Sequence, residues 1–401
     1  MRKFLVLLGV LGVFGMLRAQ EGFSFQWHGF VNPHYYADSR SVVGGREDMM
    51  LFYPKPVLRD SLGNDINDGW QANMLAITAR LNLTVHGPEI WGAKSRAFIE
   101  GDFTGATNAT INNLRLRHAY VALEWDRHQL LAGQYWYAMV IHEIMPMTNP
   151  LNMGAPFHPY ARQPQVRYSY FPSHNWELMA AAQWQLDNTS QGLLNGTVQS
   201  STLFARHSLL PELNAQLRFR QGNLLLGGAA NLKSIQPIVN TVGTASPQHL
   251  HQSLSYSLFG RYRWNQFTFK FQTLLNNSLY EGCSLGGYMM YTDPEGSPAE
   301  FRDWHFNTVW LDIERAQGHW RPGLFLGYAK HTDEAPVPEG YGSATVFGRG
   351  YDLAYLWRIQ PRLTYTTQKG LSLVGEAEYT YAGYKLPVGN LRLSLSVVYA
   401  F

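Results

Sequence analysis

Basic residues recur at every second position along several stretches of the chain, a spacing that could assemble an anion-binding surface. Alternate residues of a β-strand point to the same face, and an arginine guanidinium can hold a carboxylate or a phosphate through two parallel hydrogen bonds. A ring of such residues in a pore favours anions. The candidate pore-lining or constriction residues are Arg96, Arg115, Arg117, Arg167, Arg218, Arg220, Arg261, Arg358 and Glu143.

Acidic residues are fewer on the faces that are predicted to carry these bases. They are Glu100, Asp102, Glu177, Asp352, Glu376 and Glu378. Two interpretations therefore stay open. Either the excess of arginine gives a lumen a preference for anions, or the two signs of charge form a balanced ladder that only supports the wall.

A serine motif and a histidine pair are the strongest catalytic signals in the sequence. Residues 282–286 read GCSLG and match the G-x-S-x-G motif, but that motif needs a strand that turns into a helix. Here it lies in a long stretch between two predicted strands, so we interpret it as a chance match. His249 and His251 could share a metal, although an exposed loop edge is the simpler explanation. We predict that the protein is not an enzyme.

Acidic and amide side chains gather between residues 60 and 69. They resemble a calcium-binding loop, but Ile66 interrupts the D-x-[DN]-x-[DN]-G spacing of an EF-hand. The same residue types form tight turns without any metal. An irregular calcium site stays open as an alternative, while the prediction is for no metal site and no cofactor.

The composition suits a protein that meets both lipid and water. Charged residues make up 15% of the chain, aromatic residues 14%, and the formal net charge is +3. Without a basic block, binding to nucleic acid is not predicted. The single cysteine, Cys283, excludes an internal disulfide. Because no segment after the leader approaches the ~20 consecutive apolar residues of a spanning helix, any membrane crossing must use strands of a closed barrel.

The first residues read as an export signal. Arg2 and Lys3 precede a short apolar run from Phe4 to Leu17, and a cleavage site could follow Ala19. We therefore predict a signal peptide at residues 1–19. The remainder, residues 20–401, is predicted to form one domain, a transmembrane β-barrel.

Alternation of apolar and polar residues supports this fold class. Residues 176–186, 213–220, 253–264, 267–272 and 351–360 each place apolar groups on one face and mainly polar groups on the other. In a membrane barrel the apolar face meets lipid and the polar face lines a wet lumen. A soluble β-sandwich would also alternate, but so many long strands around one core would be unusual.

The predicted connections alternate between short and long, as in outer-membrane barrels. Short turns are expected near residues 88–92, 126–128, 172–175, 221–223, 265–266, 315–319 and 368–370. Long loops are expected near residues 37–69, 104–112, 142–162, 187–211, 233–252, 276–302, 331–347 and 383–389. The sequence therefore predicts an all-β, single closed antiparallel transmembrane barrel of about 16 strands, with short periplasmic turns and long outer loops.

Two segments add detail to this barrel. The last strand alternates Leu391 to Tyr399 with small and polar residues and ends at Phe401, like the terminal strand of bacterial outer-membrane barrels. The third long loop, residues 142–162, is rich in proline, methionine and other apolar residues. A loop of this composition is expected to fold into the barrel and narrow it, or else to pack against a neighbouring protomer.

A family resemblance rests on two adjacent segments. Residues 114–121 (LRLRHAYV) and 130–136 (LLAGQYW) resemble the paired fourth and fifth strands of the DcaP-like trimeric porins. The two segments together have only 15 residues, whereas the architecture covers nearly all of the chain. The resemblance implies a trimer of 16-stranded barrels that passes small, often anionic, solutes.

The leading functional hypothesis is an outer-membrane porin, a passive diffusion channel for small hydrophilic solutes. The expected partners are outer-membrane lipid, lipopolysaccharide and small solutes, in a homotrimer. The alternative hypothesis is an outer-membrane barrel with a plugged lumen that acts as a scaffold or as a secretion or assembly component.

Overall fold

The computed structural model describes residues 22–149, 153–240, 249–333, 337, 339–367 and 369–401. The predicted signal peptide, residues 1–19, lies outside the described residues, as do residues 150–152 of the third long loop.

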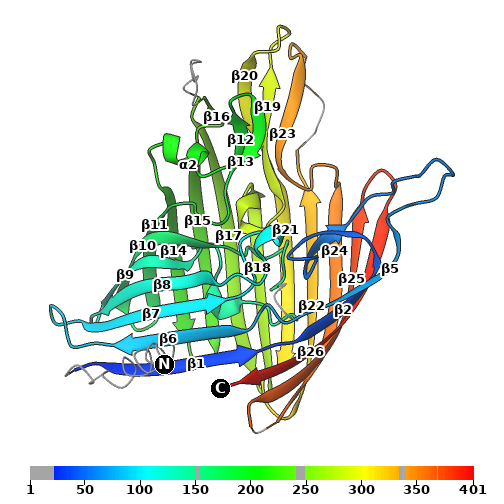
Figure 1. Cartoon of the computed structure of the whole chain (residues 1–401). Coiled ribbons are helices and arrows are strands. Elements are labelled where there is room, and N and C mark those ends of the chain that lie inside the picture. The colour runs from blue at the N-terminus through cyan, green and yellow to red at the C-terminus, as the bar shows by residue number, and fades with distance from the viewer. Residues whose placement is uncertain (1–21, 150–152, 241–248, 334–336, 338, 368) are drawn as a thin grey trace, which may run out of the picture.

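Eighteen strands form one antiparallel sheet that closes on itself (Figure 1). Two pairs of consecutive strands, β1 with β2 and β5 with β6, each make a single wall strand, so the barrel has 16 strands as predicted. The strands are β1 (Ser24–Val31), β2 (His34–Arg40), β5 (Asp68–Leu75), β6 (Arg80–His86), β7 (Lys94–Asp102), β8 (Arg115–Glu124), β9 (His128–Trp136), β10 (Arg162–Ser173), β11 (Trp176–Gln183), β14 (Glu212–Gln221), β15 (Leu224–Ile235), β17 (His251–Trp264), β18 (Phe267–Asn277), β21 (Phe306–Arg315), β22 (Trp320–His331), β24 (Tyr355–Thr366), β25 (Leu371–Gly383) and β26 (Val388–Ala400).

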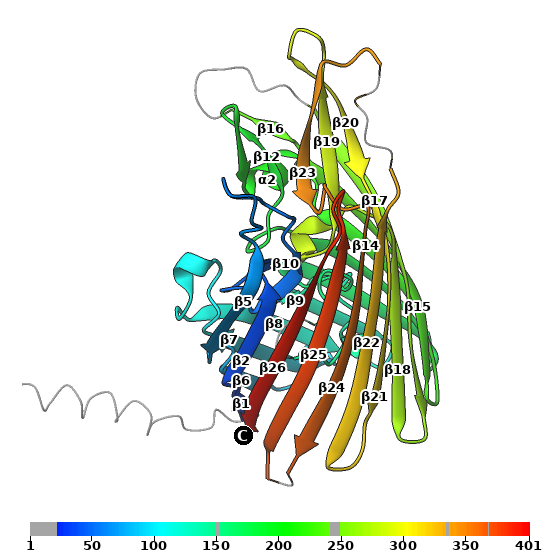
Figure 2. The same cartoon turned by 90° about the vertical axis from the view of Figure 1, so that its right-hand side faces the viewer.

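The first and last strands complete the wall. The register pairs Phe30 with Ala400 and Val31 with Tyr399, and β2 continues the ladder along β26. Figure 2 shows β26 running beside β1 and β2. The first wall strand breaks at Pro33, which has no backbone N–H to give to the ladder. Closure leaves no open edge on the main sheet.

The two faces of the wall carry the predicted residue types. On β14, Leu213 and Leu217 are exposed on the outside, whereas Asn214 and Gln216 are buried on the inside. The same division holds on β17, where Leu254 and Leu258 alternate with buried serines. An apolar outer face and a polar inner face are the reverse of a soluble sandwich and are typical of a membrane barrel.

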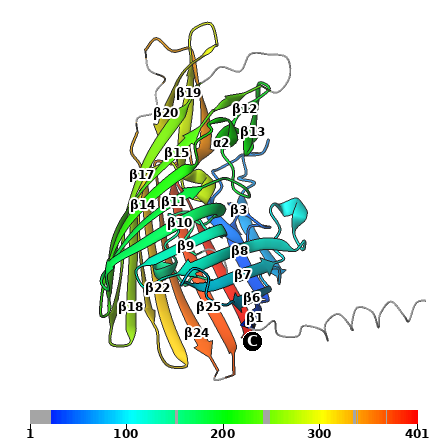
Figure 3. The same cartoon turned by 90° about the vertical axis from the view of Figure 1, so that its left-hand side faces the viewer.

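Short turns gather at one rim and long loops at the other, as the sequence predicts (Figure 1). Several loops form small sheets of their own. One consists of β12 (Gln191–Leu194), β13 (Thr197–Ser200) and β16 (Ile238–Val239), and another of β19 (Gly286–Thr292), β20 (Pro298–Trp304) and β23 (Ser343–Arg349). Figure 3 shows both standing above the long-loop rim, and we call them the crown.

The helices within the described residues are short and lie in loops. They are η1 (Asn108–Thr110), η2 (His142–Ile144), α2 (Leu203–His207) and η3 (Tyr280–Gly282). Among the described residues, no helix has the length and apolar character needed to cross a membrane.

Two strand ends differ from the sequence prediction. The strand expected from residue 351 begins at Tyr355, because Leu353 donates its N–H to Gly350 in a turn and Gly350 takes a positive φ of 81°. Asp352 therefore lies in this turn and is exposed, so it is not one of the acids on the inner face. Similarly, Trp184 and Leu186 lie beyond the end of β11.

Candidate functional site: the constriction of the barrel

The third long loop folds into the barrel. It connects β9 to β10, and we call residues 137–161 the constriction loop. Met139, Ile141, Ile144 and Phe157 of this loop are fully buried. Burial inside the barrel removes these apolar side chains from water, which is the outcome predicted from the loop's composition.

Hydrogen bonds tie the beginning of the constriction loop to one side of the wall. Gln216 of β14 donates to the carbonyl of Ala138 at 2.6 Å, and the N–H of Ala138 donates to Gln183 of β11 at 2.7 Å. Gln272 of β18 donates to the carbonyl of Met139 at 3.2 Å. Inward-facing amide side chains therefore satisfy the backbone of a loop that has no ladder partner here.

The middle of the loop reaches the opposite side of the wall. The N–H of Asn149 donates to the carboxylate of Glu376 on β25 at 3.1 Å. The hydroxyl of Ser396 on β26 donates to the side-chain oxygen of Asn149 at 2.8 Å. Between this anchor and the one at the beginning of the loop, the N–H of Met147 donates at 3.3 Å to Asp312 of β21, the strand that pairs with β18. Contacts with strands on both sides show that the loop crosses the lumen.

A second loop also enters the barrel, which the sequence analysis did not predict. The hairpin β3 (Val42–Gly45) and β4 (Met50–Pro54) belongs to the first long loop, and Leu51 and Phe52 are buried. Phe52 joins an apolar cluster with Phe157 of the constriction loop and Leu285 of the sixth loop. The apolar run MMLFY at residues 49–53 was the available signal.

Glu143 brings three predicted constriction residues together at the loop's η2 turn. Its carboxylate lies 3.1 Å from Arg218 Nη1 and 2.7 Å from Arg220 Nη2, and its carbonyl accepts from Arg261 Nη1 at 3.3 Å. Arg220 also pairs with Glu177 at 2.8 Å. The two acids balance two of the three arginines, and Arg261 forms no ion pair within the described part of the chain.

A neighbouring cluster on the wall was only partly predicted. Arg362 pairs with Asp312 at 2.7 Å, and Lys270 pairs with Glu314 at 2.6 Å while donating to the carbonyl of Met145. Lys270 lies on the polar face of the alternating stretch that was predicted at residues 267–272. Asp312 and Glu314 were missed, although their alternation with Leu311 and Ile313 indicates the face they occupy.

Arg115 and Arg117 form a separate cluster nearer the long-loop rim. Arg117 is fully buried and contacts Glu100 at 2.6 Å and Asp102 at 2.8 Å. Arg115 makes a bidentate pair with Asp102, at 3.1 and 2.9 Å. The acids predicted on the same face are thus direct partners of these arginines.

The remaining three predicted residues do not join these clusters. Arg358 is buried, pairs with Glu378 at 3.0 Å and donates to the carbonyl of Ala155 at 2.7 Å. Arg167 donates to Gln165 and to the carbonyl of Trp136, both at 3.0 Å. Arg96 pairs with Glu124 at 3.3 Å near the short-turn rim. The eight arginines therefore spread along the wall in several groups instead of forming one ring, while Glu143 lies in the constriction loop.

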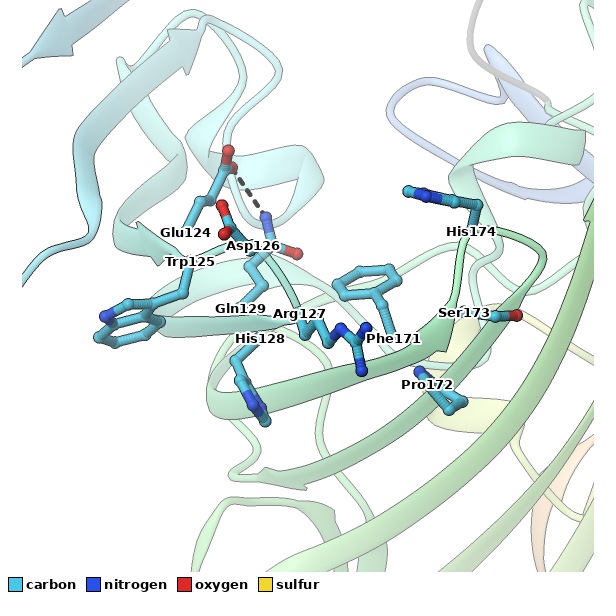
Figure 4. Close-up of a pocket in the computed structure, with 10 residues that line it drawn as sticks. All are labelled: Glu124, Trp125, Asp126, Arg127, His128, Gln129, Phe171, Pro172, Ser173 and His174. Carbon is cyan, nitrogen blue, oxygen red and sulfur yellow. Dashed lines mark hydrogen bonds between the residues drawn. The ribbon is translucent and has the colours of Figure 1, made fainter.

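An open pocket of about 720 Å³ lies at the short-turn rim, between the β8–β9 and β10–β11 turns. Figure 4 shows Glu124, Asp126, Arg127 and His174 around it, with Gln129 hydrogen-bonded to Glu124. It carries charges of both signs and shares Glu124 with Arg96. Trp125, Phe171 and Pro172 also line it, so polar and apolar groups share this pocket.

The catalytic and metal alternatives find no geometric support. After Ser284 the chain continues into strand β19 instead of a helix, so the GCSLG segment has no nucleophile-elbow setting. Asp60 accepts hydrogen bonds from the N–H groups of Leu62 and Asn64, as turn residues do. His251 contacts Asp303 at 2.9 Å. Among the described residues, no three His, Cys, Asp or Glu side chains are grouped to hold a metal.

Comparison with known proteins gives matches in structure alone. No family model matches the chain, and no curated protein matches it in sequence. The outer membrane channel DcaP of Acinetobacter baumannii superimposes with a TM-score of 0.67 at 18% identity, over 95% of this chain and 98% of that one. The fold is that of an outer-membrane porin.

Two further porin-type barrels give weaker matches. The anion-selective porin from Comamonas acidovorans has a TM-score of 0.56 at 11% identity, covering 94% of this chain and all of that one. OmpF of Salmonella typhi, solved as a complex with daunomycin, has a TM-score of 0.54 at 9% identity, covering 95% and 98%. These three solved structures are outer-membrane barrels, in agreement with the fold predicted from the sequence.

Proposed function

We propose that this protein is an outer-membrane porin, a passive diffusion channel for small hydrophilic solutes. The observation that carries the proposal is the constriction loop, which crosses the lumen and is anchored to both sides of a polar inner wall. A loop held in this way narrows the passage while the barrel wall stays closed. The polar side chains of the inner wall keep the remaining space filled with water. We do not propose an enzymatic activity.

A preference for anions is part of the proposal. Arg261 lies beside the loop without an acidic partner in the described region, whereas Arg218 and Arg220 share their acids. A cationic excess at a narrow point raises the local anion concentration. The Comamonas porin, whose barrel resembles this one, is itself anion-selective.

The test is conductance of the purified protein in a planar bilayer under a salt gradient. Open steps with an anion-selective reversal potential would support both parts of the proposal. Open steps without selectivity would refute the anion preference and keep the channel. The measurement requires protein shown to be folded by heat-modifiable migration on a gel.

A second candidate function is a plugged scaffold or a secretion or assembly component. The apolar cluster inside the barrel favours it, because Phe52, Phe157 and Leu285 bring three loops together in the lumen. If the folded protein shows no conductance in the planar bilayer, we would conclude that it has this second function and is not a channel.

The assembly proposed is a homotrimer in the outer membrane, in contact with lipid and lipopolysaccharide, after removal of residues 1–19. Closed cyclic symmetry is the usual form of homo-oligomers. Chemical cross-linking of the protein in intact outer membranes should give a ladder that ends at three copies. A ladder that stops at one copy would refute the trimer.

A further inference from the structure

A pocket of about 220 Å³ opens on the long-loop side of the constriction. Segments far apart in the sequence line it, from the first loop to the seventh. Its basic residues are Arg46, Arg115, Arg162 and Arg349. Asp187 also lines it and is exposed. We call it the arginine pocket.

Arg162 lies at the centre of the argument, because it is a buried cation with no acidic partner in the described part of the chain. It is only 4% exposed. Its Nη1 donates to the hydroxyl of Tyr160 at 3.3 Å, and its guanidinium stacks 4.8 Å from the ring of Trp136. Its Nε has no hydrogen-bond acceptor among the described residues. A buried, charged hydrogen-bond donor without an acceptor destabilises the folded protein unless another group accepts its hydrogen bond.

Two more arginines present donors to the same pocket. Arg349 lies 4.0 Å above the ring of Phe52, and its buried Nη1 has no acceptor in the described part of the chain. Arg46 donates its Nε to the carbonyl of Gly105 at 3.1 Å. Neither forms an ion pair within the residues that the structure describes. Aromatic rings support both Arg162 and Arg349, so the guanidinium planes are held in place.

The nearby acids are already occupied. Asp102 is shared by Arg115 and Arg117, and Glu100 pairs with Arg117. Within the described ranges, no other carboxylate than Asp187 lines the pocket, and Asp187 is in no ion pair with these arginines. The pocket therefore has an excess of positive charge that the described side chains do not neutralise.

We propose that the arginine pocket binds a dianionic oxyanion, namely inorganic phosphate or the phosphoryl group of a small phosphorylated solute. A phosphoryl group presents three acceptor oxygens and up to two negative charges, which matches guanidinium donors that come from three separate segments. A monocarboxylate has two oxygens and one charge, so it would leave part of this donor set without acceptors. This inference rests on the proposed channel function, and it adds a class of solute to that function. The pocket lies on the outer approach to the constriction, and its shape depends on the inward fold of the constriction loop.

Cys283 lines the same pocket and is the chain's single cysteine, so it reports on occupancy. The experiment measures the rate at which neutral iodoacetamide alkylates Cys283 in the folded, detergent-solubilised protein. Phosphate is titrated against chloride and against acetate at matched ionic strength. We expect phosphate to slow alkylation in a saturable way, and chloride and acetate to leave the rate unchanged.

Variants locate the effect. Arg349→Gln, at a partly exposed position, should abolish most of the protection by phosphate, and Arg162→Gln should do the same. Arg263→Gln is the matched control, because Arg263 is exposed on β17 beside the short turn at residues 265–266 and should keep full protection. Heat-modifiable migration establishes that each variant is folded.

The outcomes separate the pocket from the channel. Protection by phosphate that disappears in Arg349→Gln supports the pocket even if the protein does not conduct. Glycerol phosphate distinguishes a phosphorylated solute from the free phosphate ion. If it protects Cys283 as well as inorganic phosphate does, the ligand is a phosphorylated solute. If only inorganic phosphate protects, the ligand is the free ion. The proposal would be overturned if chloride or acetate slowed the alkylation of Cys283 as much as phosphate does. It would also be overturned if phosphate slowed alkylation equally in Arg349→Gln and in the wild type.

Discussion

Arg358 contacts three segments of the chain at once. It pairs with Glu378 on the neighbouring strand and donates to carbonyls of Ala155 in the constriction loop and Phe52 in the first loop. Arg117 has a comparable position between Glu100 and Asp102. At these positions the predicted constriction residues hold loops and strands in place, and their charge is already matched.

We therefore expect Arg358→Gln to destabilise the barrel. Removing one partner of a buried ion pair leaves the other charge desolvated, which typically costs about 3–5 kcal/mol. Urea unfolding of the detergent-solubilised protein measures the change in free energy. Arg358→Gln combined with Glu378→Gln should recover part of the loss, and a single variant as stable as the wild type would contradict the anchoring role.

Glu143 should control selectivity more than stability. Its carboxylate is partly exposed and neutralises Arg218 and Arg220 beside the loop. Glu143→Gln removes that negative charge while keeping the shape, so the reversal potential should move toward stronger anion preference. Glu300→Gln in the crown is the control, since Glu300 pairs with Arg302 away from the constriction. A shift toward cations in Glu143→Gln would contradict this account.

Among the elements, the constriction loop is separable from the wall. The barrel ladder runs through the strands from β1 to β26, and the loop contributes no strand to it. Deleting residues 143–158 and joining the ends with glycines should leave a folded barrel with larger single-channel conductance. Unchanged conductance in a folded deletion variant would show that the narrow point lies elsewhere, for example at the hairpin of β3 and β4.

At the base of the crown, a chain of acidic and histidine side chains links Asp303 of β20 to the ends of the wall strands β17 and β22. Asp303 lies between His251, at 2.9 Å, and His305, at 3.4 Å, and His305 contacts Asp333 of the seventh loop at 3.2 Å. His331 lies 3.9 Å from Asp333. Burial lowers the pKa of His305, but hydrogen bonds and attraction from Asp303 and Asp333 outweigh it and raise the pKa. Burial raises the pKa of Asp303, and its histidine partners reverse this and lower the pKa.

These shifts give the link a defined pH dependence. A histidine with a raised pKa stabilises the folded form fully below its unfolded value of about 6.5 and loses that contribution as pH rises through the raised value. Asp303, with a lowered pKa, stays ionised throughout this window. Hydrogen exchange near Asp333, corrected for intrinsic rates, should therefore be slower at about pH 6 than at about pH 9. Asp333→Asn should remove the difference, and a wild-type difference of opposite sign would contradict it.

For the whole molecule, the sequence predicts the barrel well and the site only in part. Apolar and polar residues alternate on β14 and β17, and this alternation identifies the lipid-facing and lumen-facing sides of each strand. Each side chain of a barrel strand can only point outward to lipid or inward to the lumen. The pairing of Arg115 with Asp102 follows from strand register and could be anticipated, whereas Arg117 lies at a β-bulge between the register pairs Glu100–His118 and Gly101–Leu116. The arginine pocket could not, since Arg46, Arg162 and Arg349 come from segments whose approach depends on tertiary packing and leaves no periodic signal.

The same limit explains the hairpin of β3 and β4. The sequence indicates an apolar run at residues 49–53, but only the size of the lumen decides whether such a run turns inward. Two loops in one lumen imply a smaller conductance than the 16-stranded wall alone would suggest.

The seam of the barrel lies at the very end of the chain. Phe401 and Gly29 exchange backbone hydrogen bonds at 2.9 and 3.0 Å, and β26 pairs with both β1 and β2. The wall thus cannot close until β26 meets β1 and β2, which are far from it in the sequence. Until these strands meet, the main sheet has unpaired edges that are open to pairing with another chain. Closure at this seam therefore also protects the folded barrel from edge-to-edge association.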